Sequence, residues 1–413
     1  MGMERVWRRQ GSADQTRRGI GPTAGAGRRR GTSGRTSGRT SSRGGGRLGR
    51  LAPAGLALLL LGGCQGQRRE AVGGSTAVDL PRVVAADGVL CDLVRRLAAA
   101  DLTVTCLLRP GEDPHAFRPT PSQRQALASA SLVLINGYQL TPALERVPGA
   151  VPLAERAVPD SPRLEAPHHH AEDSTASAGL PASPPTSAPH TPLHQPSNAH
   201  AGERDPHVWH DPRQARALVA AAAQRLAALR PQRSAAIAVR AERLERLLES
   251  LDRWNRQQLA TIPPGPAGQR PTLATGHRAA ASLARRYALE ELPLVDAHSS
   301  SAVLRPEALL EVVAVLRRRQ VRSLFTEPGP PPRALLRISQ LAGVPISPAP
   351  LVLDGLAQGG GGRPSLMATL VANTCAISEG LGGRCDRRAG AALIQRWQNV
   401  GAAGGAPAQA AAP

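Results

Sequence analysis

The chain contains no lysine: all 51 of its basic residues are arginine. The absence of lysine excludes a Walker A phosphate loop, in which a lysine reaches the nucleotide phosphates, and it excludes Schiff-base catalysis, which needs a lysine amine. Aromatic residues are also scarce, at 2% of 413 residues. The hydrophobic content of 41% still allows a core, which must then consist mainly of Leu, Val, Ala and Ile. The length has room for two domains.

The formal charge of +20 is typical of a nucleic-acid-binding protein, but its distribution argues against that class. Residues 1–50 hold 13 Arg against Glu4 and Asp14, a balance of +11, which leaves only +9 for the rest of the chain. Residues 1–46 are rich in Arg, Gly and Ser with little apolar content, so we predict a disordered extension. A nucleic-acid-binding arm is the competing interpretation. It fits poorly with the export signal that follows, and we expect no nucleic-acid partner.

An apolar stretch after this extension has the length of a secretory signal. Leu51 to Gly63 reads LAPAGLALLLLGG, which is too short to span a membrane but suits the apolar region of a signal peptide. Its end, Leu-Gly-Gly-Cys, is similar to a bacterial lipobox, in which the cysteine is lipidated. Residues 47–64 are therefore predicted to be a lipoprotein signal peptide with Cys64 as its lipidation site, followed by a tether at 65–80. A buried helix with an incidental cysteine is the alternative. Because the extension is long for the start of a signal peptide, either the start codon is assigned too early or the extension is an unusual one.

From residue 81 onward, short apolar segments alternate with helical patterns. Strands are expected at 82–86, 102–108, 132–135, 272–274, 323–326 and 344–347. Helices are expected at 89–100, 121–130, 214–259 with a break at Pro231, 278–287 and 306–319. Such alternation predicts parallel sheets covered by helices. We therefore expect an α/β fold of two lobes, each a small parallel sheet flanked by helices, joined by one long rigid helix.

The expected boundaries follow from these patterns. They are an N-terminal lobe at 81–230, a linking helix at 231–262, a C-terminal lobe at 263–400 and a disordered tail at 401–413. Within the first lobe, residues 159–204 are rich in Pro, Ser, Ala and His without an apolar period, which predicts a mobile loop. Six of the 11 histidines lie in this loop, namely His168, His169, His170, His190, His194 and His200.

The tripeptide Asp-Pro-His occurs twice, ending at His115 and at His207. In each copy the proline restricts the backbone, and the aspartate can accept a hydrogen bond from nearby amides or from the imidazole. A third histidine, His277, follows the expected strand 272–274 at the start of a helix. Turns from strand to helix lie at the carboxyl edge of a parallel sheet, where α/β folds bind their ligands. These three histidines are therefore candidate metal ligands.

In these motifs the chain resembles the periplasmic zinc- and manganese-binding solute-binding proteins of ABC transporters, the ZnuA- and TroA-like family, over roughly residues 80–400. The resemblance implies ligands at His115 after Asp-Pro, at His207 within DPHVWHDP, and at His277 ahead of a helix ending in RRYAL. The segments FTEP and VLDG match the closing part of the family's second lobe. This match implies a fourth, acidic ligand at Asp354.

The ligand types favour zinc. Three imidazoles and one carboxylate form a nitrogen-rich, roughly tetrahedral set that suits Zn²⁺, whereas Mn²⁺ prefers more oxygen. The resemblance adds that manganese-type members carry an acid at the position of His277, and that a histidine-rich loop marks the zinc-type members. His168, His169 and His170 are therefore possible accessory metal binders, or part of a plain linker. We expect Zn²⁺ as the transported ligand and Mn²⁺ less so.

Three other residues keep two interpretations each. Glu327 is either a direct ligand or a group that orients the site or closes the lobes. His210 stands where the family has leucine. Three residues beyond His207, it either faces the metal or lies on the helix surface. His298 is expected to be structural or exposed.

Apart from Cys64 the chain has four cysteines, an even number that suggests two disulfides in an exported protein. Pairing nearest neighbours, Cys91 with Cys106 and Cys375 with Cys385, keeps each bridge within one lobe, but two other pairings are possible. A zinc site of four cysteines is a weaker rival, because no Cys-x₂-Cys motif is present.

The resemblance implies a monomeric periplasmic lipoprotein, held to the membrane by its lipid, that captures Zn²⁺ with high affinity. It would deliver the metal to an ABC permease driven by a separate ATPase, and it would not be an enzyme. A manganese-binding component and a surface adhesin or metal scavenger of the same fold are the alternatives. A zinc hydrolase with Glu327 as its base is a further one, although no HExxH motif is present.

Overall fold

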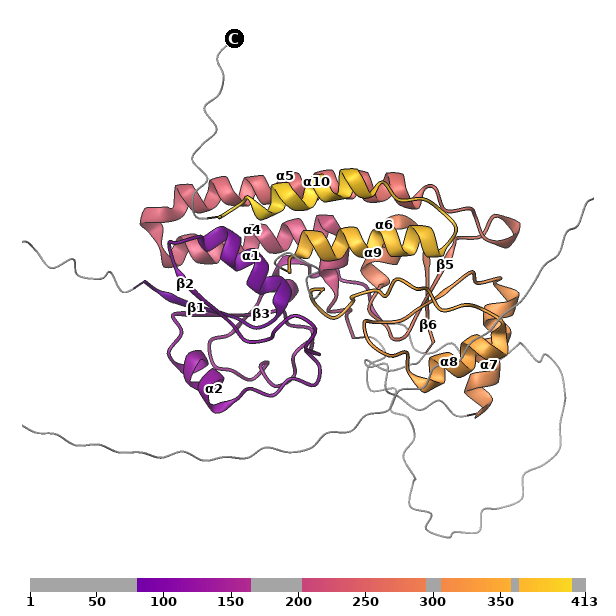
Figure 1. Ribbon diagram of the computed structural model, residues 1–413. Helices are drawn as coiled ribbons and strands as arrows, with labels where there is room; N and C mark the ends of the chain where they lie inside the picture. The colour runs from indigo at the N-terminus through magenta and orange to yellow at the C-terminus, as the bar shows by residue number, and fades with distance from the viewer. Residues whose placement is uncertain (1–79, 165–202, 295–305, 358–363, 403–413) are drawn as a thin grey trace, which may run out of the picture. The chain divides into compact units, whose positions relative to one another are not determined.

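The computed structural model describes residues 80–164, 203–294, 306–357 and 364–402 (Figure 1). These residues form two separate sheets in which every strand pair is parallel. The first sheet has the order β2-β1-β3-β4 and consists of β1 (Arg82–Ala85), β2 (Thr103–Cys106), β3 (Leu132–Ile135) and β4 (Val151–Pro152). The second has the order β6-β5-β7 and consists of β5 (Thr272–Thr275), β6 (Glu290–Pro293) and β7 (Leu324–Phe325). The predicted α/β fold with two small parallel sheets is confirmed.

Helices flank both sheets. They are α1 (Gly88–Ala98), α2 (Pro121–Ala128), α3 (Leu153–Ala157), α4 (Pro212–Leu229), α5 (Ser234–Leu259), α6 (Ala281–Tyr287), α7 (Pro306–Arg318), α8 (Arg333–Ala342), α9 (Leu366–Gly380) and α10 (Arg387–Gln398). Short 3₁₀ turns lie at η1 (Val208–His210), η2 (Pro231–Arg233) and η3 (Pro266–Gly268). The predicted break at Pro231 is confirmed, since η2 separates α4 from α5. Helix α5 packs against α4, α9 and α10, and α9 also packs against α10 (Figure 1).

Successive side chains along β1 point to opposite faces of the sheet and so enter two different cores. Val83 and Ala85 contribute to the core beneath α1, α4 and α5, whereas Val84 and Ala86 contribute to the core on the opposite face of the sheet. All four side chains are buried. A strand with both faces covered needs apolar residues at every position, which is why this segment reads as a continuous apolar run.

Helix α5 makes polar contacts with segments that adjoin the first and the second sheet. Near its start, Arg240 donates to the carboxylate of Asp101, which lies just before β2. Near its end, Asp252 accepts two hydrogen bonds from the guanidinium of Arg286 on α6. These contacts are consistent with a helix that links two lobes. Its rigidity and the expected domain boundaries stay predictions.

The last two helices, α9 and α10, are both bonded to Asp92 on α1, the helix that follows β1. The carboxylate of Asp92 accepts hydrogen bonds from the backbone N–H of Leu366 at 2.9 Å and from the indole N–H of Trp397 at 2.8 Å. Burial raises the pKa of Asp92, and the charge of Arg96 together with these donors opposes the rise. Asp92 therefore fixes α9 and α10 against α1.

Replacing Asp92 by alanine should lower the free energy of unfolding by about 2 kcal/mol, because two buried donors lose their acceptor. Urea unfolding followed by circular dichroism measures this change. The matched control is Asp160→Ala, since Asp160 is exposed and its loss should change stability by no more than about 0.5 kcal/mol. Equal stability of the two variants would contradict the role of Asp92.

Several element predictions need correction. The expected strand at 344–347 is wrong: only an isolated bridge between Leu324 and Ile346 forms there, because the segment meets β7 at one position. The helix expected at 278–287 begins at Ala281, which leaves a turn after His277. The prediction also missed β4, β6, α3, α8, α9 and α10.

Both disulfides join nearest neighbours, Cys91 with Cys106 and Cys375 with Cys385. The first ties α1 to β2, and the second ties α9 to the segment before α10. The two other pairings and the four-cysteine zinc site are therefore wrong.

Several predictions lie outside the described residues: the extension at 1–46, the signal peptide with Cys64, nearly all of the tether and the tail, the six loop histidines and His298. Arg163 and Arg204 form an antiparallel bridge at the two ends of the predicted loop. In the part of the chain that is described, no helix has the length and apolar character needed to cross a membrane.

Candidate metal centre

The two Asp-Pro-His motifs have the same backbone turn. The N–H of His115 donates to a carboxylate oxygen of Asp113 at 2.8 Å, and the N–H of His207 donates to Asp205 at 2.9 Å. His115 lies between β2 and α2, and His207 lies directly before η1. The predicted role of the aspartates as backbone acceptors is confirmed.

The second motif also orients its imidazole. Nδ1 of His207 lies 2.8 Å from an oxygen of Asp205, and both side chains are fully buried. The carboxylate accepts, so Nδ1 carries the proton and Nε2 is left to face the site. The other oxygen of Asp205 accepts from the N–H and hydroxyl of Ser282 on α6 at 3.3 and 3.4 Å. Asp205 thus ties the His207 ring to the helix that follows His277.

His277 lies in the turn between β5 and α6, at the carboxyl end of the central strand of the second sheet. Its carbonyl accepts a hydrogen bond from the hydroxyl of Thr275 at 2.9 Å, which closes the turn. The side chain is buried, with 1% exposed. His277 therefore lies at the carboxyl edge of the parallel sheet, as the sequence predicted.

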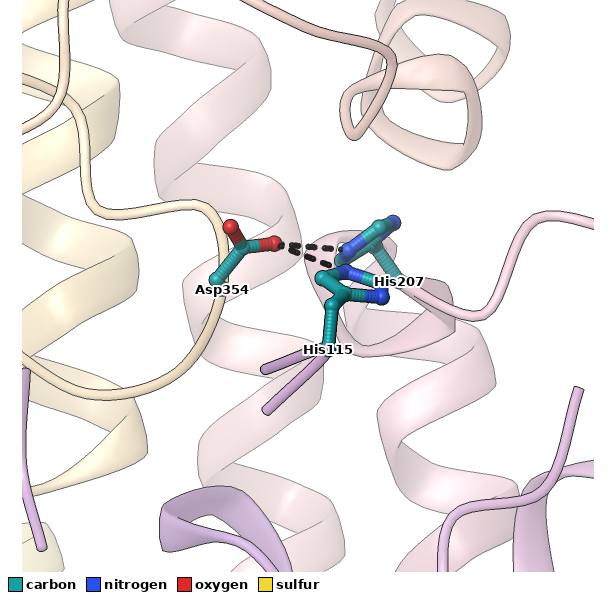
Figure 2. A group of neighbouring side chains, drawn as sticks. All are labelled: His115, His207 and Asp354. Atoms are coloured by element: carbon teal, nitrogen blue, oxygen red, sulfur yellow. Dashed lines mark hydrogen bonds and ion pairs between the residues drawn. The ribbon is translucent and has the colours of Figure 1, made fainter. Parts of the chain in front are cut away.

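The carboxylate of Asp354 is the point where the three histidines meet. Its oxygens lie 3.6 Å from Nε2 of His115, 2.9 Å from Nε2 of His207 and 3.2 Å from Nε2 of His277. Figure 2 shows the carboxylate facing the rings of His115 and His207. Residues separated by up to 239 positions in the sequence, 115 to 354, therefore converge on one small volume.

These spacings fit a metal-binding set. Tetrahedral zinc with bonds of about 2.0–2.1 Å separates neighbouring ligand atoms by about 3.3 Å, and the three nitrogen–oxygen distances of 2.9, 3.2 and 3.6 Å bracket that value. Within the described residues the donors form two groups of three that share Asp354: His115 with His207, and His277 with Glu327. The four predicted ligands are thus divided between these two groups, with Asp354 common to both.

The charges of the site are balanced between imidazoles and carboxylates. Burial alone would lower the pKa of His207, but Asp205 and Asp354 raise it to about 10. Burial would raise the pKa of Asp354, but His277 and the hydrogen bonds from the three histidines hold it well below its usual range. The carboxylates thus favour positive charge on the rings, and a divalent cation can supply that charge in exchange for protons.

Glu327, two residues after β7, lies at the side of this centre. One of its oxygens accepts from the N–H of Leu353 at 3.3 Å. Burial and the nearby charge of Asp354 raise the pKa of Glu327 to about 7. Its position next to His277 and Asp354 keeps both predicted roles open, as a ligand and as an orienting group.

His210 is not on the helix surface: that prediction is wrong, because the side chain is completely buried. It lies in η1, where the chain turns inward before α4 begins at Pro212. Its Nε2 is 3.0 Å from the carbonyl oxygen of Leu353, and burial lowers its pKa to about 4. His210 is therefore neutral and bonded to the backbone beside Asp354, and it belongs to neither group of potential metal donors among the described residues.

Three residues that contact this centre were not anticipated. The side-chain amide of Asn136, after β3, donates to the carbonyl of Pro206 at 2.9 Å. Trp209 packs edge-on against the ring of His207 at a centroid distance of 5.4 Å. Ser282 donates to Asp205, as described above. The tryptophan stood inside a recognised motif, but no local pattern marks Asn136 or Ser282.

Comparison with known proteins identifies the family. A family model described as zinc-uptake complex component A, periplasmic (ZnuA), matches residues 83–380, which is more than half of the chain. This chain belongs to the ZnuA family. The match includes all four predicted ligands.

Relatives within and around the ZnuA family differ in their metals. The zinc-binding protein TroA of Treponema pallidum is 25% identical over 251 residues, covering 61% of this chain and 71% of TroA. The manganese ABC transporter substrate-binding lipoprotein PsaA of Streptococcus mitis is 22% identical over 335 residues, covering 81% of this chain and 99% of PsaA. The family is therefore one of metal-binding components of uptake systems, and the metal varies among its relatives.

Solved structures of such proteins share the fold. TroA from Treponema pallidum aligns with a TM-score of 0.59 at 22% identity, covering 73% of this chain and 99% of TroA. Fe(III)-bound YtgA from Chlamydia trachomatis aligns with a TM-score of 0.58 at 22% identity, covering 73% and 98%. A ZnuA-family protein binds its metal for uptake and is not an enzyme, so the hydrolase alternative is wrong.

Proposed function

We propose that this ZnuA-family protein captures Zn²⁺ with His115, His207, His277 and Asp354 and delivers it to an ABC permease. The observation that carries the proposal is the convergence of three Nε2 atoms on the carboxylate of Asp354, at 2.9 to 3.6 Å. Metal transport follows from the family. The choice of zinc and of these four ligands is our proposal.

The donor set supports zinc over manganese. Three neutral imidazoles and one carboxylate give a nitrogen-rich site, and zinc binds above manganese in the usual affinity order of divalent metals. His277, almost fully buried, is the deciding residue, because a carboxylate there would make the site rich in oxygen. Manganese is the second candidate, because Glu327 offers an additional oxygen ligand next to His277 and Asp354.

The predicted lipid anchor at Cys64 would hold the protein at the membrane that contains the permease. An extracytoplasmic lipoprotein stays beside the membrane, where it can meet a permease that works with a separate ATPase. The histidines His168, His169 and His170 would act as a weak collecting arm, not needed for the main site. A surface adhesin or metal scavenger of the same fold remains the alternative use of the site.

Competition between the two metals tests this function. Protein prepared without added metal should take up one tightly held Zn²⁺, and a large excess of Mn²⁺ should not displace it. Elemental analysis after dialysis against both ions measures the ratio. Preferential retention of Mn²⁺ would contradict the zinc assignment while leaving metal transport intact.

A further inference from the structure

The two residues before Asp354, Val352 and Leu353, have their backbone groups bonded by side chains. Val352 donates its N–H to the side-chain oxygen of Asn373 at 3.0 Å, and its carbonyl accepts from the amide nitrogen of Asn373 at 2.8 Å. The N–H of Leu353 donates to Glu327 at 3.3 Å. At Val352 and Leu353, side chains thus make the backbone hydrogen bonds that a neighbouring strand would otherwise make. These bonds fix the two residues that precede Asp354.

The carbonyl of Leu353 is bonded by His210. The distance from Nε2 is 3.0 Å, and the carbonyl can only accept, so Nε2 is the donor. His210 is completely buried and lies in η1, three residues after His207. The ring of Trp209 lies 5.5 Å from that of His210 and 5.4 Å from that of His207, so one indole contacts both imidazoles.

We propose that His210 is a positioning residue that ties the Asp354 segment to the turn carrying His207, and that this tie slows the release of the bound metal. The inference rests on the proposed function, because it assumes that His207 and Asp354 bind the ion. The two ligands come from opposite parts of the sequence, 147 residues apart. The bond from His210 to Leu353 is a link between the two segments in addition to the direct contact of His207 with Asp354.

Replacing His210 by leucine removes the donor and leaves a buried carbonyl without its partner. Zinc should then dissociate about 10-fold faster, in the range expected when a residue that orients a metal ligand is lost. In the metal-free protein, backbone amides at 351–353 should exchange with deuterium faster than in the wild type. Chelator-induced release in a stopped-flow instrument and hydrogen exchange read by mass spectrometry measure the two effects.

The rescue variant is His210→Gln. Its amide nitrogen is separated from the backbone by the same number of bonds as Nε2 of histidine, so it can donate to the same carbonyl. Release and exchange rates should return to within about threefold of wild type. A thermal melt of both variants separates loss of the tie from general unfolding.

The outcomes distinguish the two proposals. If the wild type takes up no zinc, both fail. If it binds zinc but His210→Leu releases the metal at the wild-type rate, with unchanged exchange at 351–353, only the role of His210 is overturned. Equal acceleration in the leucine and glutamine variants would also overturn it, since the hydrogen bond would then not be the cause.

Discussion

Replacing His115 and His207 together by alanine should weaken zinc binding by more than about 1,000-fold. The double variant removes two of three imidazoles, whereas losing a residue that merely orients a ligand already costs about 10–100-fold. The backbone turns of both motifs can persist, because the aspartates accept from main-chain N–H groups that alanine retains. Isothermal titration with Zn²⁺, or competition with a chelator of known affinity, measures the loss.

The control replaces three histidines outside the proposed site. The triple variant at His168, His169 and His170 should bind one Zn²⁺ at the main site with unchanged affinity. Its total zinc uptake should differ from that of the wild type only by the loss of weak additional binding. If the double variant at His115 and His207 titrates like the wild type, the assignment of these two ligands is wrong.

Replacing Asp205 by alanine should weaken zinc binding by about 100-fold, although Asp205 would not touch the metal. The carboxylate holds the proton on Nδ1 of His207 and thereby presents Nε2 to the site. With alanine at position 205, the fully buried Nδ1–H of His207 has no acceptor. The ring then loses both its fixed tautomer and its fixed orientation. Zinc titration at constant pH, with a thermal melt to verify folding, measures the effect.

The first motif offers an internal control for this prediction. Asp113 makes the same backbone turn as Asp205, but it is exposed and accepts a hydrogen bond from the main-chain N–H of His115. Asp113→Ala should therefore change zinc affinity by only about twofold. Similar losses in the two variants would mean that the backbone turn matters and that the carboxylate–imidazole contact does not.

The sequence predicted the parts of the fold that have local patterns. The apolar run of β1, the alternation in β2 and the proline between α4 and α5 are each marked by neighbouring residues. Strand β6 was missed because its sequence, Glu-Glu-Leu-Pro, is polar and short; its pairing with β5 comes from tertiary contacts. The expected strand at 344–347 failed for the opposite reason, since an apolar segment found only one bridge partner.

The candidate ligands were predictable because they stand in motifs, whereas their surroundings were not. His115 and His207 share a tripeptide, and His277 follows a recognisable strand. The position of His210 was misjudged because a helical spacing from His207 was assumed, while a 3₁₀ turn directs its side chain into the interior. The contact between Asp205 and Ser282 joins residues 77 positions apart, and no local pattern reports such a contact.

Anomalous diffraction at the zinc absorption edge, on crystals of the zinc-loaded protein, tests whether the four proposed ligands bind one ion. We expect a single strong peak within bonding distance of Nε2 of His115, His207 and His277 and of the carboxylate of Asp354. A peak bound only by the histidines of the 165–202 segment, or a zinc ion that leaves two or more of these four side chains uncoordinated, would contradict it.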